Sequence, residues 1–246
     1  MNRAGRIAGA ALSWMLLLFT LAAAVCGIAG NGGLLAREML RFAPPDRTGL
    51  PQEEYDGVGQ MIAGYLTGRE EEFRYEFSLG GDAVYTCFQP HEAAHMRDCR
   101  GLIRLAGSLR WVFGGAALIF LGAAVLVPGL RRPMAKGMTA GLAVFGAMAA
   151  GLTVWGLADF DGLFTAFHRL AFTNDGWLLD PRTDLLIRLM PTDFFIALAE
   201  RCLLWLAGAA AVIWIGSYEL RRNIPPEGGG TEEPRKRPDS GAGDQL

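Results

Sequence analysis

The three histidines of this chain, His91, His95 and His168, lie in two polar segments that separate long apolar runs. Histidine titrates near neutral pH, so one imidazole can accept a proton in one step of a reaction and return it in the next. His91, His95 and Asp98 are spaced by four and three residues, which places them on one face of a helix with Glu92 at its edge. The residue types and their spacing predict an active site assembled from both segments.

The string His91-Glu92-Ala93-Ala94-His95 also reads as H-E-x-x-H, the helix of zinc metallopeptidases. A catalytic zinc needs a third protein ligand and an open position, and His168, Asp180 and Asp184 are the candidates. No third histidine follows in the local sequence. A zinc site and a solvated helix face without function both remain alternatives to acid–base chemistry.

The apolar runs predict four transmembrane helices. Each run is close to the roughly 20 residues that cross a bilayer core as a helix. The fourth reaches that length if it begins near Phe194 and tolerates Glu200 and Arg201 at the interface. The stretches without a charged side chain lie between Arg6 and Arg37, Arg110 and Arg131, Lys136 and Asp159, and Arg201 and Glu219.

Basic residues near the helix ends predict the orientation. Arg131, Arg132 and Lys136 occupy the link between the second and third helices, and arginines also flank both ends of the chain. Both termini and this link are therefore expected in the cytoplasm, and segments 31–104 and 159–193 are expected outside. The first run could instead be a cleaved signal peptide, because Ala22–Ala24 supplies small residues. Its length and the charge pattern favour a retained helix.

The first outer segment predicts a small α/β cap. Pro51, followed by acids and by apolar residues at helical spacing up to Gly68, indicates an amphipathic helix on the membrane or on the cap's own core. Alternation from Phe73 to Leu79, the turn Gly80-Gly81 and a returning strand from Ala83 to Phe88 indicate a β-hairpin. Pro90 then opens a helix that runs into the second membrane span.

Composition limits the remaining possibilities. We expect one membrane domain over 1–222 and a disordered cytoplasmic tail over 223–246, which is rich in proline, glycine and charge. The net charge of −2 argues against a nucleic-acid partner. Cys87 and Cys99 share the outer segment, but their spacing leaves open whether they form a disulfide.

At these residues the chain resembles the bacterial lipoprotein intramolecular transacylases called Lit, over about residues 7–222. Length and the four-helix topology agree with this family. Cys99 replaces an expected aliphatic residue, and His91 lies outside the family pattern, so the H-E-x-x-H string reads as accidental. The matching motifs are Glu92-x-x-His95-Met96-x-Asp98, Phe164-x-x-Phe167-His168, Phe172, Asn174-Asp175-x-Trp177, Asp180, Asp184-x-x-Ile187 and Pro191-x-x-Phe194-Phe195.

The resemblance implies an acyltransferase of the bacterial cytoplasmic membrane with an outward-facing site. It would move the sn-2 acyl chain of a diacylglyceryl group to the α-amine of the amino-terminal cysteine of the same lipoprotein, giving the lyso form. His95 and His168 are expected to be the catalytic pair, and Asp98 to orient His95. No cofactor or metal is expected, and membrane lipid is the other partner. Supporting or substrate-binding roles are predicted for Glu92, Asp175, Trp177, Asp180 and Arg104.

Direct attack by the amine is favoured over a covalent intermediate. No G-x-S-x-G elbow is present in the chain, and neither Cys87 nor Cys99 shows a sequence feature of a nucleophile. Two other functions stay open, a membrane zinc metallopeptidase that uses His91, Glu92 and His95, and a non-catalytic membrane scaffold.

Overall fold

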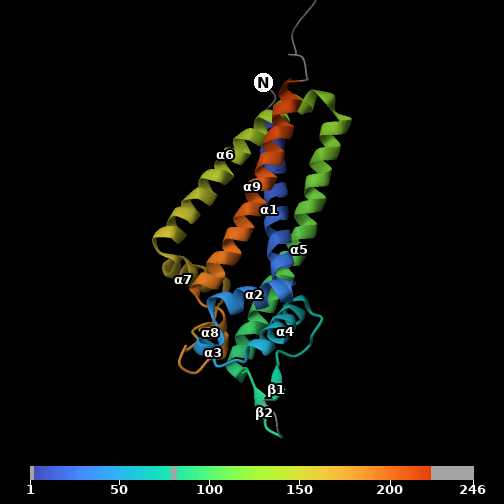
Figure 1. Ribbon diagram of the computed structural model, residues 1–246. Coiled ribbons are helices and arrows are strands. Elements are labelled where there is room, and N and C mark those ends of the chain that lie inside the picture. Colours follow the sequence, from blue (N-terminus) through green and yellow to red (C-terminus); the bar gives the residue numbers. More distant parts are fainter. Residues whose placement is uncertain (1–2, 79–81, 223–246) are drawn as a thin grey trace, which may run out of the picture.

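The computed structural model describes residues 3–78 and 82–222, and helices dominate it (Figure 1). Four of them are long and apolar enough to span a membrane, as the sequence predicts: α1 (Arg3–Ala29), α5 (Pro90–Leu126), α6 (Pro128–Ala158) and α9 (Thr192–Arg222). Helix α5 begins at Pro90 and continues unbroken from the cap into the membrane bundle, also as predicted. The expected tail, 223–246, lies outside the described residues.

Helix α1 packs against each of the other three long helices. The contact with α6 is close because small residues face each other. A Cβ atom on Gly9 would lie 1.9 Å from the Met134 carbonyl oxygen, and one on Gly137 would lie 1.9 Å from that of Arg6. Such packing through small residues is how helices associate in lipid, where burial of apolar surface supplies no driving force. A first helix held in this way belongs to the bundle.

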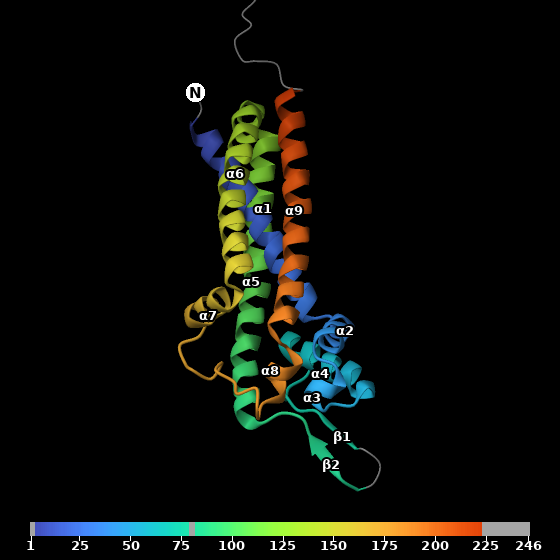
Figure 2. The same ribbon diagram turned by 60° about the vertical axis from the view of Figure 1, so that its left-hand side comes forward.

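The ends of the bundle are sorted in space. Figures 1 and 2 show the start of α1, the end of α9 and the turn between α5 and α6 at one end, with the cap and α7 at the other. The basic link expected between the second and third helices is reduced to Val127, because Arg131, Arg132 and Lys136 lie inside α6. The Arg131 side chain donates to the Ala124 carbonyl at 2.9 Å and so caps the end of α5.

The cap is built from α2 (Gly32–Phe42), α3 (Pro45–Thr48), η1 (Gln52–Glu54), α4 (Tyr55–Thr67) and the antiparallel strands β1 (Glu76–Ser78) and β2 (Val84–Thr86). The predicted helix and hairpin are thus both present, although the strands are shorter than the alternation suggested. Gly80 and Gly81, the expected turn, lie outside the described residues. Gly68, with φ of 82°, ends α4 in the left-handed conformation that glycine accepts without strain. The sequence had indicated neither α2 nor α3.

The amphipathic helix α4 packs on the core of the cap. Tyr55, Val58 and Ile62, at most 2% exposed, lie in one cluster with Met39 of α2 and Leu189 of α8 (Leu185–Leu189). Spacings of three and four residues put the α4 side chains on one face, which the cap then covers. The cap core therefore joins segment 31–104 to segment 159–193, and it includes Met96 of α5.

Candidate active site

Helix α5 and helix α7 (Phe160–Ala171) bring His95 and His168 together. Their ring centroids are 6.1 Å apart, and the residues are only 8% and 7% exposed. Buried histidines of different elements placed this close are a suitable arrangement for transferring protons to and from one reacting group. The pairing of the two histidine segments expected from the sequence is therefore present.

The contacts of His168 determine which ring nitrogen carries its proton. Its Nδ1 donates to the Phe164 carbonyl oxygen at 2.8 Å, because a carbonyl can only accept, so Nε2 holds the lone pair of the neutral ring. Phe164, Phe167, Phe172 and Trp177 surround the ring with centroid distances of 4.0 to 5.4 Å. Burial lowers the pKa of the His168 imidazole below its usual value, and the bond to Phe164 opposes this only in part. His168 is accordingly a neutral base near pH 7.

His95 keeps one ring nitrogen without a partner. Its Nδ1 is buried with no hydrogen bond among the described residues, while Nε2 lies 3.5 Å from the Cys99 Sγ. The Phe172 ring packs edge-on at 5.3 Å. A buried polar atom without a partner is costly. The Nδ1 atom is therefore available to a partner that enters beside the two rings.

Asp98 bonds across to the loop that follows α7. The Asn174 Nδ2 donates to the Asp98 Oδ2 at 3.0 Å, and the Asn174 Oδ1 accepts from the Gly176 amide at 2.9 Å. Asp98 was expected to orient His95, but the described contacts contain no hydrogen bond between the two side chains. The contact between Asn174 and Asp98 instead ties this loop, and with it Trp177 on His168, to α5. Sequence reasoning gave Asn174 no role, although it stands beside Asp175 and Trp177 in the same motif.

Glu92 is completely buried and links the start of α5 to α8. Its Oε2 accepts from the Gln89 amide and its Oε1 from the Leu186 amide, both at 2.7 Å. The first bond completes a capping box at the start of α5, and the second fastens α8 to it. Both Glu92 oxygens are therefore occupied by backbone donors, and its supporting role in the site stays a prediction.

His91 points to a different partner from that of His95. Its Nε2 lies 3.0 Å from the Oδ2 of Asp184, which is 2% exposed and also accepts from the Asp180 amide. Within residues 3–78 and 82–222, no group of three His, Cys, Asp or Glu side chains is arranged to hold a metal ion. Of the H-E-x-x-H residues, His91 thus joins α5 to the segment before α8 and Glu92 joins it to α8, whereas His95 faces His168.

The remaining predicted site residues lie at the edge of the pair or away from it. Trp177 lies on His168, with ring centroids 5.0 Å apart. Asp175 is exposed in the same loop, and Asp180 forms an ion pair with Arg182 at 2.7 Å. Arg104 is exposed on α5, and the described contacts of its side chain include neither histidine.

Two further features came only from the structure. Cys99 contacts His95, and all four cysteines are free thiols, so the described structure contains no disulfide between Cys87 and Cys99. Arg201, which the sequence marked as an ionisable group near the membrane, forms an ion pair with the buried Glu38 of α2. That pair explains how α9 carries an arginine at this level.

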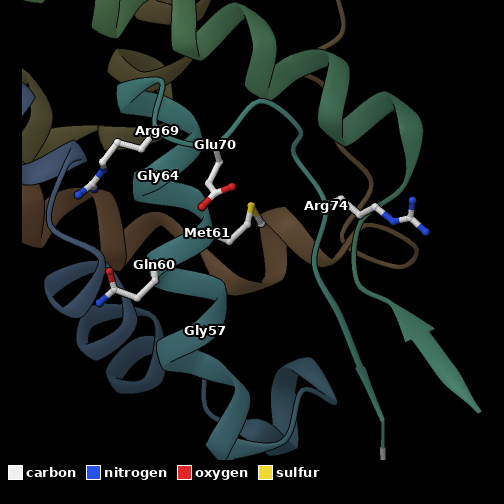
Figure 3. Close-up of a pocket in the computed structure, with 7 residues that line it drawn as sticks. All are labelled: Gly57, Gln60, Met61, Gly64, Arg69, Glu70 and Arg74. Carbon is white, nitrogen blue, oxygen red and sulfur yellow. The ribbon is translucent and has the colours of Figure 1, made fainter.

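A hollow of about 490 Å³ lies elsewhere on the cap. Figure 3 shows its walls on α4 and on the chain that leads to the hairpin. Its lining residues are Gly57, Gln60, Met61, Gly64, Arg69, Glu70 and Arg74. Neither histidine borders it, so the buried pair rather than this hollow is the candidate active site.

Four apolar spans that carry a small cap and a buried pair of histidines define an integral membrane protein. A family model described as lipoprotein intramolecular transacylase Lit matches residues 10–195. The chain therefore belongs to this family of transacylases. A search among curated proteins found no match.

Solved structures of the membrane-integral lipoprotein intramolecular transacylase Lit from Bacillus cereus share the fold. One superposes with a TM-score of 0.70 at 17% identity, covering 90% of this chain and 98% of that one. Variants of the same protein with a histidine replaced by arginine or by alanine give TM-scores of 0.66 and 0.67 at 17% and 19% identity. They cover 90% of this chain and 93% and 95% of theirs. At this identity the likeness concerns the fold, and it supports the predicted helical membrane architecture.

Proposed function

We propose that this protein transfers the sn-2 acyl chain of a diacylglyceryl group to the α-amine of the same lipoprotein's amino-terminal cysteine, giving the lyso form. Membership of the transacylase family supplies the reaction class. The observation that carries the proposal is the buried pair of His95 and His168, with ring centroids 6.1 Å apart, an unpartnered Nδ1 on His95 and a lone pair on the Nε2 of His168.

The reaction requires one proton to move between two heteroatoms. The amine nitrogen attacks the ester carbonyl carbon and loses a proton to a histidine. The addition gives a tetrahedral intermediate. The C–O bond to glycerol then breaks, and the leaving oxygen takes a proton from a histidine, which leaves an amide and a free sn-2 hydroxyl. His168 Nε2, the lone-pair nitrogen of a neutral ring, is suited to the first step. Donor and acceptor belong to one molecule, so the enzyme mainly has to bring them together.

A thioester on Cys99 is the competing mechanism. The Cys99 Sγ lies 3.5 Å from the His95 Nε2, which is a distance at which an imidazole could activate a thiol. However, Cys99 is largely covered and follows Asp98 directly, and both an apolar setting and a neighbouring carboxylate disfavour the thiolate. Direct amine attack therefore remains the proposed route. Retention of transfer in a Cys99→Ala variant supports it, and loss of transfer in a well-expressed Cys99→Ala variant would favour the thioester.

The zinc metallopeptidase alternative is disfavoured by the contacts of Glu92. That residue would have to activate a water molecule, yet both of its oxygens accept backbone hydrogen bonds in a fully buried position.

We further propose that the protein lies in the bacterial cytoplasmic membrane with both termini inside and the histidines outside, and that residues 1–222 form one domain. The basic residues at the bundle end opposite the cap support this orientation.

The decisive experiment is mass spectrometry of a reporter lipoprotein's amino-terminal peptide in a host that lacks amine acylation. Expression of this protein should convert the diacylglyceryl form into a product of the same mass with an amide-linked acyl chain, which fragmentation distinguishes. An unchanged amino terminus in the presence of well-expressed, membrane-inserted protein contradicts the proposal and returns it to the scaffold alternative.

A further inference from the structure

Helix α7 has three distinct sides. Phe164 and His168 face the protein, where His168 is 7% exposed and Phe164 packs on Phe195 of α9 with ring centroids 5.1 Å apart. Asp161 and Arg169 are exposed on the polar side. The third side is apolar yet open, with Leu170 at 89% and Phe167 at 52% exposure and Leu163 beside them. A helix in water would not leave such a side uncovered.

The open apolar side continues the surface of a membrane span. Only Asp159 separates α6 from α7, and the last turns of α6 expose Leu157 at 83% and Val154 at 65%. Asp159 accepts from the Gly162 amide at 2.9 Å and so starts the new helix directly after the turn. Figure 2 shows α7 projecting sideways from the foot of α6, not extending it.

We propose that α7 is an interfacial helix whose Leu163, Phe167 and Leu170 lie among the acyl chains of the bilayer leaflet nearest the cap. A helix with one apolar and one charged side takes this position, with its axis in the plane of the membrane surface. The occupant of the open side is lipid, because the side adjoins the lipid-facing surface of α6 and because Asp161 and Arg169 lie where head groups and water would be.

This position also sets the depth of His168. The ring lies between the apolar and the polar side of α7, so it is held at the level where hydrocarbon gives way to polar groups. Ester carbonyls of glycerolipids lie at that level. The ring centroid of Phe167 is 5.3 Å from that of His168. An acyl chain that lies beside Phe167 would therefore be close to His168. This consequence rests on the proposed function, whereas the membrane position of α7 does not.

The test compares neighbouring positions in protein reconstituted into phosphatidylcholine and phosphatidylglycerol vesicles. A spin label is attached to a Leu170→Cys variant and to an Arg169→Cys variant, and the parent protein is carried through the same labelling as a blank for its own cysteines. Dissolved oxygen, which concentrates in hydrocarbon, should speed the relaxation of the label at 170. A water-soluble nickel chelate should speed the relaxation of the label at 169. Equal exposure of both labels to the chelate overturns the proposal. Shielding of the label at 170 from both reagents also overturns it, because a second protein surface would then cover this side.

A matched pair of substitutions links the position of α7 to transfer. Leu170→Asp places a charge on the apolar side and should lower acyl transfer by about tenfold to 10²-fold by displacing His168 from the ester. Arg169→Asp places the same residue on the polar side and should change the rate by less than about twofold. If the spin labels show the expected depths but the wild-type protein makes no amide-linked product, the proposed function fails while the interfacial position stands. Equal transfer by the Leu170→Asp and Arg169→Asp variants overturns the link to His168.

Discussion

The first and second turns of α5 carry similar side chains in contrasting environments. In the first turn, His91 pairs with Asp184 at 3.0 Å and Glu92 accepts two backbone hydrogen bonds, so each polar group is engaged. In the second, His95 is buried with an unpartnered Nδ1 and faces His168. Interactions that are complete stabilise a structure, whereas a buried group left incomplete has capacity for a substrate. Under the proposed function, the difference separates a structural turn from a chemical one, although both are equally prominent in the sequence.

The largest effect is expected from the chemical turn. His95→Ala and His168→Ala should each lower the yield of amide-linked product by about 10²-fold to 10⁴-fold, the usual contribution of general acid–base groups. Because paired groups act as one unit, the double variant should be little worse than the worse single variant. The measurement is the mass-spectrometric assay, with immunoblots showing equal amounts in the membrane. Near-normal conversion by His168→Ala would remove that residue from the proposed chemistry.

Glu92→Gln tests the structural turn. The amide can accept one backbone hydrogen bond but presents a donor to the other backbone N–H, so one buried N–H loses its partner. We expect a loss of about 1–3 kcal/mol of unfolding free energy, which is the usual cost of an unsatisfied buried group. A thermal melt in detergent should show it as a lower Tm, and activity at low temperature should survive in the fraction that stays folded. An unchanged Tm with lost activity would instead assign Glu92 to the chemistry.

The hydrogen bond between Asp98 and Asn174 could serve either structure or chemistry, and two variants distinguish these roles. Asn174→Asp places two carboxylates within about 3.0 Å and should lower transfer by about tenfold, since a hydrogen bond to a charged group is worth about 1.5–3 kcal/mol. Exchange of the two residues, Asp98→Asn with Asn174→Asp, restores a donor and an acceptor at the same contact. Recovery of transfer in the exchanged protein indicates that the link positions the loop. Continued loss with a normal Tm indicates that the charge beside His95 is itself required.

The pH profile tests whether His168 is the neutral base. Burial holds its pKa below the ordinary value of about 6.5, so the ring should stay unprotonated and active as the pH falls past that value. The acidic side of the kcat/KM profile should therefore steepen only below about pH 6.5, in addition to the fall that the substrate's own α-amine produces as it protonates near about pH 8. Stability follows in the same direction, because the stabilising effect of the neutral ring is present above the unfolded-state pKa and is lost as the pH falls through it toward the folded-state value. A second titration above about 7, beyond that of the amine, would exclude His168 as this base.

The smallest effect is expected for His91→Ala. The His91 side chain is half exposed, and the buried Asp184 keeps its hydrogen bonds from the Asp180 amide and the Thr183 hydroxyl when His91 is removed. We therefore expect a loss of only about 1 kcal/mol of stability, the usual net worth of one hydrogen bond. Transfer should remain within about twofold of wild type, and chelators should have no effect. Stoichiometric zinc in the purified protein that disappears with the activity in this variant would reverse the preference for acyl transfer over metallopeptidase chemistry.

Much of the architecture is determined by local sequence pattern. Four uncharged runs predict four membrane helices, since an apolar segment in lipid must satisfy its backbone hydrogen bonds internally. Pro51 precedes η1 and α4, Gly68 ends α4, and alternation marks the hairpin, because these signals act within a few residues. Helices α2 and α3 were not predicted. Such short helices are stabilised mainly by packing on the cap core.

The candidate active site shows the same division between what local sequence pattern predicts and what tertiary packing decides. The sequence by itself determined that histidine segments flank the membrane helices on one side and that His95 and Asp98 share a helix face. Only the tertiary structure decided that His168 meets His95, that His91 pairs with Asp184, and that Asn174 donates a hydrogen bond to Asp98. The physical reason is that the packing of α7 and the following loop against α5 selects which polar groups become engaged and which stay free. Spacing along one helix cannot reveal a partner that another helix supplies.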